Sequence, residues 1–114
     1  DGTSKFGALD GIIRDRIKLA INGLIFVSII IDENDEMLGE PWCEIRGLAD
    51  FGKSNCNFID VLEEDISQYM GRSSLSIIQD DDRLEKEIES VVRQTALAEI
   101  GKKPEVSIII SRLS

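Results

Sequence analysis

Apolar positions mark three extended segments along this 114-residue sequence. Residues 24–31 are apolar at nearly every position, which is typical of a strand in the middle of a sheet. A second strand is predicted to begin at residue 40 or 42 and to end at residue 48, and its alternating polar residues leave one face wet. Residues 106–113 form the third. The acidic turn at residues 32–36 joins the first two strands, so we expect an antiparallel hairpin with a longer loop.

The faces of these strands carry more apolar surface than a small helical layer would cover. The first strand places Leu24, Phe26 and Ile30 on one face and Ile25, Val27, Ile29 and Ile31 on the other; the third places Val106, Ile108 and Ile110 opposite Ser107, Ile109 and Ser111. We therefore expect a partner on the uncovered side of the sheet. The residues predicted for that interface are Ile25, Val27, Ile29, Ile109 and Trp42.

Two helices are predicted between the second and third strands. The first begins after Asn57, a capping residue, and ends just before Gly71; its apolar stripe is Phe58, Leu62, Ile66 and Tyr69 with Met70. The second begins after Asp80 or Asp81 and ends at Gly101, with Pro104 preventing its continuation. Residues 72–79 are predicted to be a connection, because three serines make a regular helix less favourable. Residues 9–21 fit a short extended piece and a helical turn equally well.

This element order predicts an α+β fold built as a two-layer sandwich. A small three-stranded mixed sheet would carry two helices on one face, in the order β-β-α-α-β. We expect residues 1–21 to be a lead-in segment and residues 22–114 to form a single domain. Because the sequence begins at Asp1, we expect an excised or processed piece of a longer protein.

The charge of the chain is acidic and unevenly distributed. The formal net charge is −9, from 13 basic and 22 acidic residues. The excess lies between residues 32 and 101, since the segments before and after it are slightly basic. Such a surface repels phosphate backbones, so the domain is not expected to be the main grip on a nucleic acid. Solubility explains the charge without a specific partner.

The residue types exclude most catalytic chemistry within this chain. The sequence contains no histidine, which excludes Ser-His-Asp and Cys-His catalysis and any histidine-ligated zinc site. Cys43 is expected to be a buried filler, and Cys56 precedes a helix without an evident reactive role. The acidic groups at residues 32–36 and 80–82 fit a solvated turn and a helix cap better than a metal site. No catalytic, metal or cofactor site is predicted here.

Three stretches together resemble the C-terminal domain of ribonuclease J, a bacterial β-CASP metallo-β-lactamase ribonuclease. The first is Asp1-Gly2, the segment Ile12-Ile13-Arg14-Asp15-Arg16 with Leu19, and Gly23. The second is the 24–31 strand with its acidic hairpin and the return to Ile45-Arg46-Gly47. The third is Lys102-Lys103-Pro104 before the final strand. The resemblance spans nearly the whole chain through the order and spacing of these motifs, although the 49–59 loop and the region around Gln79 match no motif of the family.

The resemblance implies a specific role. The whole enzyme would be a two-zinc hydrolase that degrades RNA from a 5′ monophosphate end and also cuts internally. Its zinc ligands would lie in a catalytic domain outside this sequence. The family's C-terminal domain supports dimerisation and full activity without catalytic residues. The expected partners are the chain's own catalytic domain and a second copy, with RNA as substrate of the parent enzyme, no membrane, and a cytoplasmic location.

Two alternatives remain open from the residues. One is a direct RNA-binding module acting through Arg14, Arg16, Lys18, Lys102 and Lys103. The other is an unrelated α+β module for dimerisation or regulation that pairs through its sheet.

Overall fold

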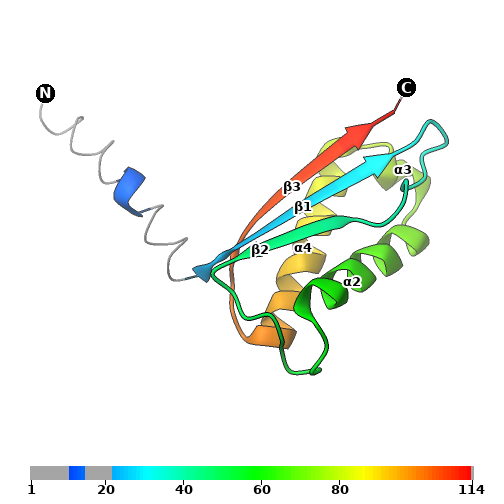
Figure 1. Cartoon of the computed structure of the whole chain (residues 1–114). Helices are drawn as coiled ribbons and strands as arrows, with labels where there is room; N and C mark the ends of the chain where they lie inside the picture. The colour runs from blue at the N-terminus through cyan, green and yellow to red at the C-terminus, as the bar shows by residue number, and fades with distance from the viewer. Residues whose placement is uncertain (1–10, 15–21, 114) are drawn as a thin grey trace, which may run out of the picture.

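The fold is a two-layer α+β sandwich, as the sequence predicts. A computed structural model describes residues 11–14 and 22–113 of the chain. Its elements are β1 (Leu24–Ile31), β2 (Trp42–Arg46), α2 (Phe58–Arg72), α3 (Leu75–Ile78), α4 (Asp81–Ile100) and β3 (Glu105–Arg112). Figure 1 shows the three strands in one layer with the helices behind them. Among the described residues, 11–14 form a helical turn, and the other residues for which both conformations were open lie outside the described part.

The sheet is mixed, with the most apolar strand in the centre. The strand order is β2-β1-β3; β2 runs antiparallel to β1, and β3 runs parallel to it. The hairpin between β1 and β2 has the acidic turn that the sequence indicates, and an additional bridge joins Ile31 to Met37. Strand β2 ends at Arg46 rather than at residue 48, because the next residue, Gly47, leaves the extended region with φ 70°.

The core lies between one face of the sheet and the helices. Helix α2 packs against β2, and α4 packs against β3 and α2. The fully buried large side chains are Phe58, Ile25, Ile29, Ile31, Leu62, Ile66, Leu84, Ile88, Val27 and Val92. Thr95 of α4, also buried, places its Oγ1 2.6 Å from the Asp65 carboxylate of α2 and so links the two helices. The apolar stripe predicted for the first helix is buried in this core.

Capping residues begin both long helices, and end the second one, where the sequence predicts them. The Asn57 side chain accepts a hydrogen bond from the Ile59 N–H at 2.9 Å, and Asp80 accepts one from the Arg83 N–H at 3.3 Å. Both bonds satisfy backbone donors that a helix start leaves unpaired. Gly101 ends α4 in the left-handed conformation, with φ 63°. A side chain there would be strained, so the residue type defines the end of the helix.

The connection between the long helices differs from the prediction. Helix α2 continues through Gly71 to Arg72, so Gly71 lies within its last turn. Residues 72–79 are not an irregular connection, because the one-turn helix α3 forms there. The N–H groups of Ile77 and Ile78 both reach the Ser74 carbonyl at 3.1 Å. Burial of Ile78, which is 7% exposed, favours this turn over the local preference of the serines.

Candidate interaction surface

The second face of the sheet carries exposed apolar side chains, and none of the helices in residues 22–113 lies over it. Trp42 is 65% exposed, Ile109 47% and Ile30 40%. Trp42 and Ile109 both lie beside Ser28, one on each neighbouring strand, so the two exposed apolar side chains flank a serine in one row across the sheet. Leu24 and Phe26 lie half-buried on the same face. We call this surface, made of Leu24, Phe26, Ile30, Trp42 and Ile109, the open face.

The open face contains two of the five residues predicted for an interface. Ile109 and Trp42 are exposed on it. The prediction is wrong for Ile25, Val27 and Ile29, which are 0% exposed and belong to the core beneath the helices. Both faces of β1 are apolar, so the sequence of β1 did not indicate which face the helices cover. The neighbouring strands do indicate it: Phe26 pairs with Glu44 on one side and with Ser107 on the other, and these polar neighbours mark its face as the one away from the core.

Charged residues border the open face along β2. Glu44 and Arg46 point to the same side as Trp42, and the Arg46 Nη2 lies 3.0 Å from the Glu44 Oε1. Both side chains are largely exposed, so the pair contributes little to stability. The open face thus combines an apolar centre with a charged margin, an arrangement typical of protein–protein interfaces.

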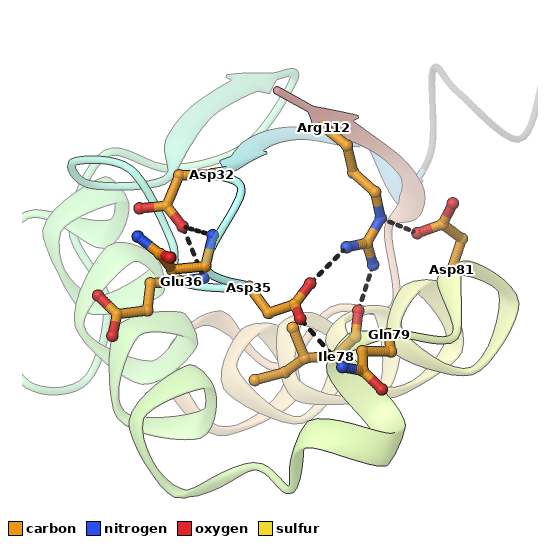
Figure 2. Close-up of polar contacts among 8 residues, drawn as sticks. Asp32, Asp35, Glu36, Ile78, Gln79, Asp81 and Arg112 are labelled. Atoms are coloured by element: carbon orange, nitrogen blue, oxygen red, sulfur yellow. Dashed lines mark hydrogen bonds and ion pairs between the residues drawn. The ribbon is translucent and has the colours of Figure 1, made fainter. Parts of the chain in front are cut away.

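A polar network surrounds the side chain of Arg112 at the end of β3 (Figure 2). The Arg112 Nε lies 2.7 Å from Asp81 Oδ1, its Nη1 lies 3.4 Å from Asp35 Oδ1, and its Nη2 donates to the Ile78 carbonyl. Gln79 Nε2 donates to Asp35 Oδ2 at 3.0 Å. One guanidinium therefore joins the end of β3 to the hairpin, to α3 and to the start of α4. This role of Arg112 was not predicted from the sequence, where the available signal was a single arginine in the last strand of an acidic chain.

The acidic turn has a structural explanation in the same region. The Asp32 carboxylate accepts hydrogen bonds from the Asn34 N–H at 2.9 Å and from the Glu36 N–H at 3.0 Å (Figure 2). Asp35 adopts a left-handed conformation, φ 61°, and faces Arg112. Within the described residues, no group of three or more His, Cys, Asp or Glu side chains is arranged to hold a metal ion.

The loop before α2 is fixed to the end of α4 through Glu99. The Ser54 hydroxyl donates to the Glu99 carboxylate at 2.8 Å, and the Lys53 N–H donates to the Glu99 carbonyl at 2.8 Å. A Cβ on Gly52 would lie 2.5 Å from that carbonyl oxygen, so the close approach requires glycine. This segment, which matched no motif in the sequence analysis, is therefore part of the packed structure.

The two cysteines differ in environment. Cys43 is buried on the helix side of β2, and burial, followed by the nearby Glu63 charge, raises its pKa to about 12. Cys43 is therefore a neutral thiol at physiological pH, as expected for a filler. Partial burial raises the pKa of Glu63, and the carboxylates of Glu40 and Asp60 raise it further. Cys56 is exposed.

The basic residues predicted for RNA contact are not assembled into a site by the part of the chain that the structure describes. Lys102 and Lys103 are exposed in the turn after α4, and Arg14 is exposed in the helical turn at residues 11–14. Arg16 and Lys18 lie outside the described residues. RNA contact through these five residues stays a prediction.

Comparison with known proteins identifies a family. The family model described as "Ribonuclease J C-terminal domain" matches residues 11–113. None of the curated proteins matches the sequence. Within the described residues, no helix is long and apolar enough to cross a membrane.

Proposed function

Because the chain belongs to the ribonuclease J C-terminal domain family, we propose that it is a non-catalytic accessory domain of a ribonuclease J. In this role it packs against the catalytic core of its parent enzyme and supports the enzyme's self-association and activity. The family membership agrees with the resemblance found in the sequence motifs and extends over all the described strands and helices.

The open face is the observation that carries this proposal. Trp42, Ile30 and Ile109 are each between 40% and 65% exposed, on a sheet face that none of the described helices covers. Leaving large apolar side chains in water costs about 25 cal/mol for each Å² that a partner would otherwise bury. A group of exposed apolar side chains with a charged margin fits a surface that is covered in the assembled enzyme.

The chemistry of the parent enzyme lies outside this chain in our proposal. The sequence offers no histidine, and the donor groups of the described residues do not fit a zinc site. Zinc and RNA are therefore assigned to a catalytic domain that degrades RNA from the 5′ end and cuts it internally, in the cytoplasm. The net charge of −9 favours an accessory role over an RNA-binding one.

The experiment compares the parent enzyme with three altered forms: one lacking this chain, one carrying Trp42→Ser with Ile30→Ser, and one carrying Leu75→Ser as the matched control. Leu75 is 59% exposed on α3, away from the open face. We expect removal of the chain to lower ribonuclease activity and weaken self-association, and the open-face pair to lower activity while Leu75→Ser does not.

Thermal unfolding of the isolated chain provides the folding control for these variants. All three substituted residues are exposed, so the unfolding temperature should change little. A parent enzyme that keeps full activity and unchanged self-association after loss of the chain would refute the accessory role.

A further inference from the structure

Within the described residues, no strand pairs with the outer edge of β3. Strand β3 is the last strand of the sheet, and it runs for eight residues, Glu105–Arg112 (Figure 1). It contains no proline, and its charges lie only at its two ends. Long, apolar edges of this kind readily accept another strand.

The hydrogen bonds to β1 reveal which groups point outward. The Glu105 N–H donates to the Gly23 carbonyl and the Leu113 N–H donates to the Ile31 carbonyl, each at 2.9 Å. In a parallel pair, alternate residues bond to the same neighbour, so the odd-numbered residues of β3 face β1. The N–H and C=O groups of Val106, Ile108, Ile110 and Arg112 therefore point away from β1. In the described part of the chain, nothing pairs with the outward groups of Val106, Ile108 and Ile110.

The opposite edge of the sheet is protected. Strand β2 has five residues, follows Pro41 directly, and carries the charged residues Glu44 and Arg46 on the open face. Short length, a proline and exposed charges are the features that prevent strand addition. The two edges thus differ in strand length, in proline and in the placement of charge, and among the described strands β3 is the edge better suited to pairing.

We propose that two copies of this chain pair antiparallel along β3, which joins their sheets into one six-stranded sheet. The proposal rests on the self-association proposed above and names its surface. In this arrangement a two-fold axis passes beside Ile109. The outward groups of Ile108 then meet those of Ile110 of the second copy, and those of Val106 meet Arg112 of the second copy.

The sequence of β3 is self-complementary in this register. Ile109, which is 47% exposed, lies opposite Ile109 of the second copy on the open face. Ser107 lies opposite Ser111 of the second copy, so neither bulk nor like charge opposes the approach. These are non-hydrogen-bonded pairs, in which the side chains approach most closely. The open faces of the two copies become continuous.

The helix side of the edge is also suited to contact. A groove of about 360 Å³ lies between α4 and the beginning of β3, and Leu97 and Pro104 contribute its apolar part. Leu97 is 51% exposed on α4. A second sheet added at β3 would bring the second copy's α4 toward this surface, because α4 packs against β3 in each copy.

Disulfide cross-linking of the 114-residue chain tests the register directly. In a Cys56→Ser background, which removes the exposed native thiol, Ile109→Cys places two thiols opposite each other across the axis. The matched control is Ile30→Cys, at a similarly exposed isoleucine on the central strand. We expect mild oxidation to convert the Ile109→Cys chain to a covalent dimer and to leave the Ile30→Cys chain monomeric on a non-reducing gel.

Charged substitutions at positions 107 and 111 test the same pairing without a cross-link, through the dissociation constant of the dimer. Ser107→Lys with Ser111→Lys sets lysines opposite one another at both ends of the pair, whereas Ser107→Lys with Ser111→Glu sets opposite charges there. The double-lysine chain has the smaller net negative charge, so general repulsion alone would favour its association. We expect the reverse by sedimentation equilibrium: a dimer dissociation constant about tenfold higher for the double-lysine chain.

The outcomes separate this proposal from the one on which it rests. Cross-linking at position 109 together with the charge order above supports pairing along β3. A chain that associates, but without cross-linking at position 109 and without a difference between the two charge variants, overturns this geometry and leaves the accessory function standing. A chain that stays monomeric at millimolar concentration overturns both the pairing and self-association through this domain.

Discussion

Ile29 and Ile30 are consecutive isoleucines on the central strand, and they meet opposite environments. Ile29 is 0% exposed beneath the helices, whereas Ile30 is 40% exposed on the open face. Arg112 and Arg46 show a similar contrast: Arg112 reaches the hairpin and two helices, whereas Arg46 forms an exposed ion pair with Glu44, two positions away on its own strand. The face of the sheet beneath the helices therefore contributes most to folding, whereas the open face is available for contacts with a partner.

The largest expected effect comes from shortening the two isoleucines in turn. Ile29→Ala leaves a cavity in the core and should lower the free energy of unfolding by about 2–5 kcal/mol. Ile30→Ala removes a partly exposed side chain and should cost less than about 1 kcal/mol. Urea denaturation of the two variants measures the difference. Equal losses would mean that the two faces of β1 are not distinguished as described.

The two arginines provide an intermediate effect. Arg112→Met removes hydrogen bonds that join β3 to Asp35, Asp81 and the Ile78 carbonyl, and should cost about 1–2 kcal/mol after allowance for solvent screening. Arg46→Met removes a single exposed ion pair and should cost about 0–0.5 kcal/mol. Thermal unfolding at low and high salt compares them. A larger loss for Arg46→Met would contradict the role assigned to Arg112.

The smallest effect concerns the thiol on the helix side. The folded chain raises the pKa of Cys43 to about 12 from an ordinary value of 9.0, so the folded state holds this proton more tightly than the unfolded state. The protonated Cys43 thiol therefore contributes to the free energy of unfolding in full below pH 9, and this contribution is lost as the pH rises toward 12. At pH 10 the loss should be about 1 kcal/mol, and Cys43→Ala should remove it.

Thiol labelling provides an independent check on the same contrast. At pH 8 a disulfide reagent should modify Cys56, which is exposed, and should reach Cys43 only after urea unfolds the chain. Rapid labelling of both thiols in the folded protein would be inconsistent with the burial of Cys43.

Local chemistry made much of the fold predictable from the sequence. Asn57, Asp80 and Gly101 act within a few residues of themselves, and each defines a helix end as expected. The choice of covered face on β1 was not predictable from that strand alone, because it depends on how β2 and β3 align beside it. The same holds for α3, whose turn depends on burial of Ile78 in a distant core.

The candidate surface was predictable only in outline. The excess of apolar strand positions over the helical cover indicated an exposed face, and Trp42 and Ile109 lie on it. The Arg112 network joins residues from four elements, and Asp35 lies 77 positions away from Arg112 along the chain. No local pattern specifies a contact of that range, so it became visible only in the folded arrangement.

The parallel pairing of β1 with β3 has a consequence for the order of folding. The paired residues Leu24 and Glu105 are about 80 positions apart, while β1 and β2 meet through a short turn. The hairpin should therefore form early, and the last strand should join it only after the helices have packed. Until then the second edge of β1, the most apolar strand, remains open to other chains. Pairing of β3 with β1 would thus protect the domain from aggregation during synthesis.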